Sequence, residues 1–134
     1  TAGKPYSIVL EPAQDSIFAR LHHVQNSHVR CGGSIIVEKG CYNGHLYCEG
    51  QLQVDGILRG GTYHAVSGMN VQEAGSPGTG TTSLRVGAKG VLRARKILAG
   101  TTIQVGERLH QFLDDREHVT VRLNSDNEFV WHGE

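Results

Sequence analysis

Apolar residues in the middle of the chain fall into columns when the sequence is aligned with a 17-residue period. Three consecutive segments align in this way, 29–37, 46–54 and 63–71. The residues between the apolar positions are mostly polar. The aligned columns of apolar or small residues are Val29/Leu46/Tyr63, Cys31/Cys48/Ala65, Ile35/Leu52/Met69 and Val37/Val54/Val71, and a fifth column places Cys41 over Leu58. A fixed period of this length predicts a repeat architecture, in which each unit packs mainly against its neighbours.

Within each repeat the apolar residues stand two apart, which is the period of a β-strand whose alternate side chains point to one side. Glycines separate these strand-like pairs, and glycine is favoured at corners because it adopts backbone angles that a Cβ disfavours. We therefore predict an all-β fold, a β-solenoid with 17-residue coils. The coils are expected to stack in parallel, about 4.8 Å apart, around the apolar columns.

The 17-residue register changes after Val71. Residues 72–82 are rich in Gly, Ser, Thr and Pro, a composition typical of loops, and we interpret them as an enlarged corner of the solenoid. Apolar pairs resume beyond this corner and continue to about Gly106. The solenoid is therefore predicted over residues 26–106.

The two ends of the chain are predicted to differ from the coils. Residues 1–25 hold strand-like runs without the 17-residue spacing, and we expect them to cover the exposed edge of the solenoid. Residues 107–134 are expected to form a turn and a β-hairpin cap, because their apolar residues alternate on both sides of a second turn. A chain of 134 residues is expected to form one domain overall.

Three glycine-spaced segments carry a resemblance to a known family. They are 26–37, 71–76 followed by Thr82, and 103–106. The first is similar to the pattern S-x-V-x-A-G-G-D-I-x-V, the second to V-x-E-L-G-S followed by T, and the third to I-x-I-G. With these motifs the chain resembles the β-solenoid domain of the bacterial flagellar assembly protein A family. The departures from the family pattern are Cys31, Ser34, Cys48 and Ala74.

The resemblance implies a single-stranded, right-handed parallel β-helix and a function without catalysis. The implied role is that of a scaffold or protein-interaction domain, linked to flagellar biogenesis or cell-pole organisation. It further implies a location in the bacterial cytoplasm, with the cell pole as one place there, and a flagellar or cell-pole protein as partner. Since full-length members carry further modules on both sides, we expect the present sequence to be an excised domain. Two alternatives remain open: a self-assembling structural solenoid like the bactofilins, and a carbohydrate-active solenoid enzyme.

The charge balance narrows the classes of partner. The chain has 13 Lys and Arg and 13 Asp and Glu, so its formal net charge is zero, whereas binding to nucleic acid or to an anionic membrane draws on an excess of basic charge. No apolar run is long enough to cross a membrane. Three cysteines cannot close a disulfide framework and fit a reducing cytosol. We therefore expect a protein partner, no membrane insertion and no nucleic acid, and leave homo-oligomer formation open.

Histidines and cysteines form the first candidates for chemistry. His28 and His45 are one 17-residue period apart and are expected to stack in one outward column, but Thr62 takes the third position, so we expect a surface ladder and no metal site. Cys31 and Cys48 share an inward column at a spacing that a disulfide tolerates. We interpret them as small buried thiols that pack as apolar residues. No cofactor is expected.

Charged residues form the second set of candidates. Glu38 and Asp55 are expected to stack on the outside, where paired acids could serve acid/base catalysis or hold a cation, but we interpret them as solvated turn residues. The chain has one basic run, which lacks the aromatic side chains that stack on bases and is interpreted as a solvated face or a patch for an acidic partner. The run consists of Arg85, Lys89, Arg93, Arg95 and Lys96.

Four residues are predicted to contact a partner. Glu73 and Ser76 belong to the enlarged corner, and Tyr47 and His64 stand one 17-residue period apart in one outward column. Loops on a rigid scaffold are where binding residues collect. No catalytic residue is predicted.

Overall fold

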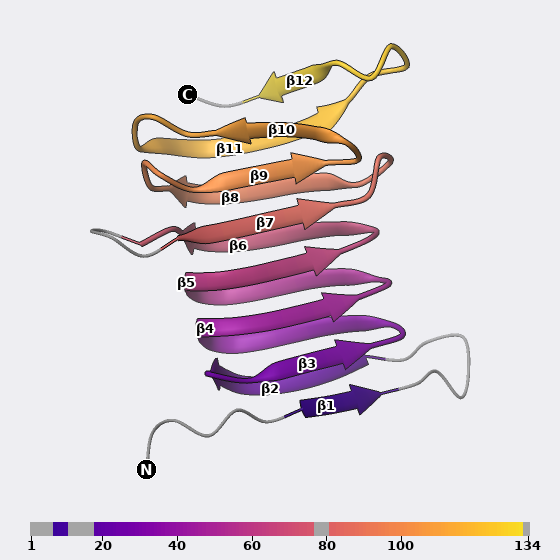
Figure 1. Cartoon of the computed structure of the whole chain (residues 1–134), viewed down its shortest axis with the longest axis vertical. Helices are drawn as coiled ribbons and strands as arrows, with labels where there is room; N and C mark the ends of the chain where they lie inside the picture. Colours follow the sequence, from indigo (N-terminus) through magenta and orange to yellow (C-terminus); the bar gives the residue numbers. More distant parts are fainter. Residues whose placement is uncertain (1–6, 11–17, 77–80, 133–134) are drawn as a thin grey trace.

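The computed structural model describes residues 7–10, 18–76 and 81–132, and every regular element in these residues is a β-strand (Figure 1). The strands are β1 Ser7–Leu10, β2 Phe18–Gln25, β3 His28–Cys31, β4 Ser34–Cys48, β5 Gln51–Ala65, β6 Gly68–Ala74, β7 Thr82–Val86, β8 Val91–Ile97, β9 Thr102–Val105, β10 Arg108–Gln111, β11 Arg116–Leu123 and β12 Phe129–His132. The described residues contain no helix of the length and hydropathy needed to cross a membrane.

The strands wind into a β-solenoid of about five turns, which confirms the predicted fold class. Val29 of β3 pairs with Leu46 of β4, which in turn pairs with Tyr63 of β5, and both pairings are parallel. In Figure 1 the chain runs to the right along the nearer strands and returns to the left along the fainter, more distant strands as it rises toward the C-terminus. This course is right-handed, as the family resemblance implied.

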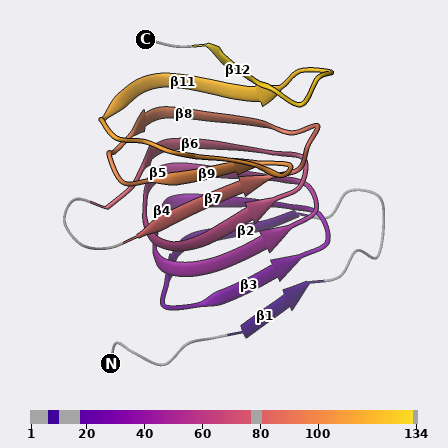
Figure 2. The ribbon, with the colours of Figure 1, turned by 45° about the horizontal axis from the view of Figure 1, so that its top comes forward.

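Each coil has two faces, seen as opposite walls in Figure 2. One wall contains β3, residues 44–48 of β4, residues 61–65 of β5, β7 and β9. The other wall contains β2, the first parts of β4 and β5, β6 and β8. The long strands β4 and β5 therefore pass through both walls.

The bends of β4 and β5 depend on residues that adopt positive φ. Asn43 has a φ of 53° in β4, and Gly60 and Gly61 have φ of 70° and 97° in β5. A Cβ on Gly61 would also collide with the carbonyl oxygen of Gly44 in the preceding coil, so this corner requires glycine for both conformation and space. At this corner the structure explains why the sequence has glycine.

Apolar columns fill the interior between the two walls, as the 17-residue alignment predicted. Residues of these columns are almost fully buried, with exposed fractions of 0–4% for the aligned positions. Two hydrogen bonds of the Tyr63 hydroxyl tie the bends of adjacent coils together, because this hydroxyl donates to the Gly60 carbonyl (2.7 Å) and accepts from the Gly44 N–H (3.1 Å). Burial raises the pKa of Tyr63 well above its usual value, so the hydroxyl keeps its proton.

The enlarged corner is shorter in the structure than the predicted residues 72–82, because residues 72–74 belong to β6 and Thr82 belongs to β7. β6 continues through Ala74 and β7 begins at Thr82, so the connection between them comprises residues 75–81, of which 77–80 lie outside the described residues. His64 pairs with Arg85, whereas one coil earlier Tyr47 pairs with His64, so the step across the corner is longer than the 17-residue period. The additional residues thus lie in the corner, and the apolar columns stay aligned on both sides of it.

At the N-terminal end, the parallel stacking begins before residue 26. β1 pairs in parallel with β3, with Ile8 opposite Val29, and β2 pairs in parallel with β4, with Ala19 opposite Ile35. The first of these steps is longer than the 17-residue period and the second is shorter, which explains why the alignment of repeats did not include the two strands. They extend the solenoid downward in Figure 1.

At the C-terminal end, the parallel order gives way to antiparallel pairing. β10 folds back on β9, β11 lies antiparallel on β8, and β12 pairs with β11. The predicted hairpin of β11 and β12 is confirmed, with Val121 opposite Trp131. Val119 and Val121 are buried, so β11 closes the apolar interior above the last coil.

Candidate partner-binding face

The outward side chains of one wall form two continuous columns, and we call this surface the histidine face. Its strands are β3, residues 44–48 of β4, residues 61–65 of β5, β7 and β9. Residues directly opposite one another in the register make up the columns Arg30/Tyr47/His64/Arg85/Gln104 and His28/His45/Thr62/Ser83/Thr102. Because strand side chains alternate, these columns point outward where the neighbouring apolar columns point inward.

Tyr47 and His64 are in contact, as their shared column predicted. Their ring centroids lie 5.0 Å apart with an interplanar angle of 80°, an edge-to-face arrangement that aromatic rings favour. The guanidinium of Arg30 lies over the Tyr47 ring, 4.8 Å from its centroid. The three side chains therefore support one another along the column.

His64 is held in its neutral form at neutral pH. Partial burial lowers the pKa of its imidazole below the usual value of 6.5, and the neighbouring Arg85 guanidinium lowers it further. Both effects disfavour the imidazolium, the first by desolvation and the second by like charge. A negative group placed beside His64 and Arg85 would act in the opposite direction.

His28 and His45 stack as the sequence predicted. Their ring centroids lie 4.6 Å apart with an interplanar angle of 17°, and Nδ1 of His45 lies 2.6 Å from the hydroxyl oxygen of Thr62. Within residues 19–76 and 81–131, no group of three or more His, Cys, Asp or Glu side chains is placed to hold a metal ion. The column presents stacked imidazoles followed by hydroxyl groups.

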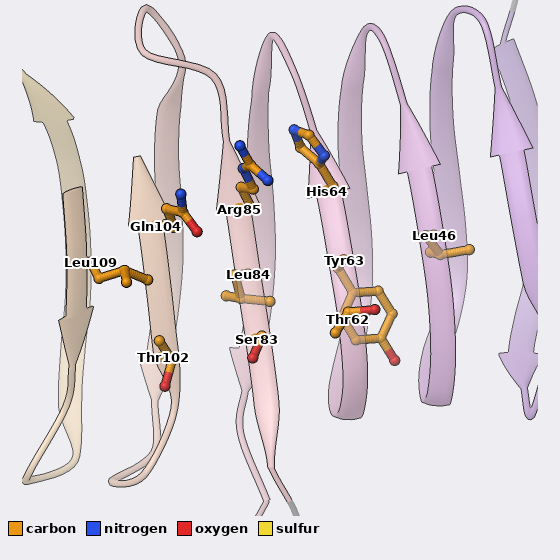
Figure 3. A pocket seen from close by; sticks show the side chains of 10 residues that line it. All are labelled: Leu46, Thr62, Tyr63, His64, Ser83, Leu84, Arg85, Thr102, Gln104 and Leu109. Atoms are coloured by element: carbon orange, nitrogen blue, oxygen red, sulfur yellow. The ribbon is translucent and has the colours of Figure 1, made fainter. Parts of the chain in front are cut away.

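A shallow hollow lies over the second half of the histidine face. Its volume is about 350 Å³. Figure 3 shows His64, Arg85 and Gln104 projecting from three successive strands along it, with Leu109 of β10 at its far end. Thr62, Ser83 and Thr102 of the second outward column also line the hollow.

The strands of the histidine face contain no Asp or Glu, although all of their residues are described. Within residues 19–76 and 81–131, neither Arg30 nor Arg85 has a carboxylate partner. We call the outward surface of the opposite wall the ion-paired face. There, Nη1 of Arg20 lies 3.0 Å from Oε2 of Glu38, and Nη2 of Arg59 lies 2.9 Å from Oε2 of Glu73. Cationic groups on the histidine face are thus available to an external anion.

Glu73 and Ser76, the other two predicted contact residues, lie elsewhere. Glu73 belongs to β6 and binds Arg59. Ser76 follows β6, and its hydroxyl lies 3.1 Å from that of Thr82 at the start of β7. The structure therefore brings Tyr47 and His64 together but does not join them with Glu73 and Ser76 in one surface.

The remaining candidates are two buried thiols and two outward carboxylates, and each carboxylate accepts a hydrogen bond from a side chain of the fold. Cys31 and Cys48 are directly opposite each other, buried and free, and burial together with Cys31 raises the pKa of the Cys48 thiol to about 12. The hydrogen bond from Arg20 holds the pKa of Glu38 below its usual value, and Asp55 accepts a hydrogen bond from Gln53 (2.8 Å).

The basic run of the sequence is divided between the two walls. Arg85 belongs to the histidine face on β7, whereas Arg93, Arg95 and Lys96 belong to β8. Sequence reasoning grouped Arg85 with the wrong neighbours and did not single out Arg30. The signal for Arg30 was present, because it stands one 17-residue period before Tyr47.

The comparisons with known proteins give one match. A family model described as the flagellar assembly protein A beta solenoid domain matches residues 12–96. Neither the curated proteins nor the solved structures that were compared include a match to this chain. The matched residues contain β2 to β8 and hence most of the parallel coils.

Proposed function

Because the chain belongs to the flagellar assembly protein A family, we propose that it is a non-enzymatic scaffold that binds a protein partner through the histidine face. The partner is a component of the flagellum or of the cell pole, and the binding takes place in the bacterial cytoplasm. Tyr47 and His64 form the centre of the contact surface. Glu73 and Ser76 mark a second, separate contact at the enlarged corner.

One observation carries the proposal. Side chains of the histidine face project from adjacent hydrogen-bonded strands, so their positions are fixed by the solenoid and need little ordering when a partner binds. A surface organised in advance loses less conformational entropy on association. The contacts of Arg30 with Tyr47 and of Tyr47 with His64 organise the column further.

The proposal is tested by affinity capture from a lysate of a flagellated bacterium, with the 134-residue chain as bait. We expect a flagellar or cell-pole protein to be retained by the native chain and lost with the double variant Tyr47→Ala/His64→Ala. The matched control is Gln53→Ala/Asn70→Ala, which alters two outward residues that pair across the opposite wall. A Glu73→Gln/Ser76→Ala variant tests the corner separately.

Each result of the capture experiment has a defined meaning. Equal retention by the native chain and by the Tyr47→Ala/His64→Ala variant would exclude the histidine face as the contact surface. Retention of nothing by the native chain would contradict the scaffold proposal and leave the solenoid as a spacer. Circular dichroism of every variant checks that the β-fold is kept.

A self-assembling solenoid is less well supported. Coils that stack end to end need an open last coil, whereas β11 and β12 add antiparallel strands above β8. An end of this kind does not continue the parallel register of the coils. Filaments of the native chain in electron micrographs would favour the polymer over the scaffold.

A further inference from the structure

We propose that the histidine face recognises an extended acidic segment of its protein partner, in which two carboxylates stand four residues apart. This inference rests on the proposed function and adds the chemistry of the partner. One carboxylate binds Arg30 and the other binds Arg85. The residue midway between them packs against Tyr47 and His64.

The residues of the histidine face indicate that the partner segment is negatively charged. The histidine face carries Arg30 and Arg85 together with three histidines, and its strands contain no carboxylate. On the opposite wall, by contrast, carboxylates are present, and Glu38 and Glu73 pair with Arg20 and Arg59. The further cations of that wall, Arg93, Arg95 and Lys96, form no ion pair within residues 19–76 and 81–131, so the distinguishing feature of the histidine face is its lack of carboxylates. Guanidinium groups match carboxylates in geometry as well as charge, because their N–H donors can form paired hydrogen bonds.

The spacing of the carboxylates comes from the register. Arg30, Tyr47, His64 and Arg85 occupy successive positions of one column, so three steps between strands separate the two arginines. At about 4.8 Å for each step, their backbones lie about 14 Å apart. An extended peptide advances about 3.4 Å for each residue, so four residues cover the same distance.

Strand geometry also fixes which side chains of the segment face the solenoid. In an extended chain, alternate residues point to the same side, so the first, third and fifth residues of such a segment face the column together. The third residue then lies over Tyr47 and His64, which are partly buried and in edge-to-face contact. An aliphatic side chain at this position would pack against His64 and against the part of Tyr47 that the Arg30 guanidinium leaves uncovered.

The same column is a poor match for nucleic acid. Each strand of duplex DNA carries a negative charge about every 3.4 Å, whereas this column has guanidinium groups only at Arg30 and Arg85. Single-strand binding also uses exposed aromatic faces for base stacking, and the Arg30 guanidinium already lies over the Tyr47 ring. The acidic protein segment is therefore the occupant that the arrangement favours.

The test uses fluorescence anisotropy with the full 134-residue chain and a labelled peptide that has two glutamates four positions apart and a leucine midway. A second peptide of identical composition has its glutamates two positions apart, and a third has glutamine in place of both. The protein variants are Arg30→Gln and Arg85→Gln. The matched control is Arg93→Gln, which removes an exposed arginine from the opposite wall.

We expect the first peptide to bind most tightly, with each face variant weakening it roughly three- to fivefold and Arg93→Gln leaving it unchanged. The binding should also weaken as salt is added, because the arginines are exposed. Equal binding of the glutamine peptide, or an equal loss with Arg93→Gln, would overturn the inference. Tighter binding of an oligothymidine of similar length would replace the acidic segment with nucleic acid.

Failure of this inference can be told apart from failure of the proposed function. If the Tyr47→Ala/His64→Ala bait loses its partner while the peptides show no dependence on charge, the histidine face is still a contact surface and only the acidic chemistry is wrong. If that bait keeps its partner, the proposed function fails whatever the peptides do. Circular dichroism confirms that Arg30→Gln and Arg85→Gln retain the fold.

Discussion

The two walls of the solenoid share one interior and differ on their outer surfaces. Both walls turn alternate apolar side chains into the same buried columns. On the outside, the ion-paired face has carboxylates that pair with Arg20 and Arg59, although Arg93, Arg95 and Lys96 on the same wall form no ion pair within residues 19–76 and 81–131. The strands of the histidine face have no carboxylate at all beside Arg30 and Arg85. Exposed ion pairs contribute little to stability, so the fold permits either arrangement. The difference between the walls therefore points to binding rather than to folding.

The largest effects should come from the interior and should be alike for the two walls. Leu84 lies behind the histidine face and Leu92 behind the other wall, and both are buried. We expect Leu84→Ala and Leu92→Ala each to lower the free energy of unfolding by about 2–5 kcal/mol, as measured by urea denaturation. A loss with only one of the two variants would show that the walls do not share a common interior.

A smaller loss is expected at the bends that lead into the histidine face. The Tyr63→Phe variant removes the hydroxyl that binds the Gly44 N–H and the Gly60 carbonyl. Leaving these buried backbone groups without a partner should cost about 1–3 kcal/mol of unfolding free energy. Tyr42→Phe is the control, because the Tyr42 side chain is 39% exposed, and an equal loss with it would contradict the role of the buried hydroxyl.

The outer surfaces should respond differently to the loss of a charge. Glu73→Gln breaks the ion pair with the partly buried Arg59 and should lower the free energy of unfolding by about 0.2–1 kcal/mol. Arg85→Gln should leave stability nearly unchanged, because Arg85 is exposed on a surface without carboxylates. Chemical denaturation of both variants checks the contrast. A larger loss with Arg85→Gln than with Glu73→Gln would reverse the comparison between the walls.

The smallest effect is a dependence on pH that arises at His64. Because burial and Arg85 hold the pKa of His64 below 6.5, the unfolded chain binds a proton more readily, and His64 lowers native stability as pH falls through that value. Binding of the acidic peptide should change in the opposite direction, since an imidazolium between Tyr47 and Arg85 attracts carboxylates. His64→Gln should reduce both dependences, measured by denaturation and by anisotropy. If His64→Gln left the pH dependence of the unfolding free energy and that of peptide binding unchanged, His64 would not be the group that titrates.

The sequence predicted those parts of the fold in which two patterns coincide: the alternation of side chains along each strand and the 17-residue step between paired strands. Cys31 and Cys48, or His28 and His45, face each other because both the alternation and the 17-residue step place them so. β10 was not predicted as a strand, since all four of its residues are exposed. Only backbone pairing with β9 defines this strand, and such pairing leaves no pattern of apolar residues.

Alternation and period in the sequence were sufficient to fix the interior columns and the contact of Tyr47 with His64. They could not place Arg85 in the same column, because the residues inserted at the corner break the count between His64 and β7. Hydrogen bonding between neighbouring coils restores the register there and separates Arg85 from Arg93 on the opposite wall. The position of Arg85 in the candidate binding column thus depends on how the coils stack beyond the corner, which no local pattern of residues encodes.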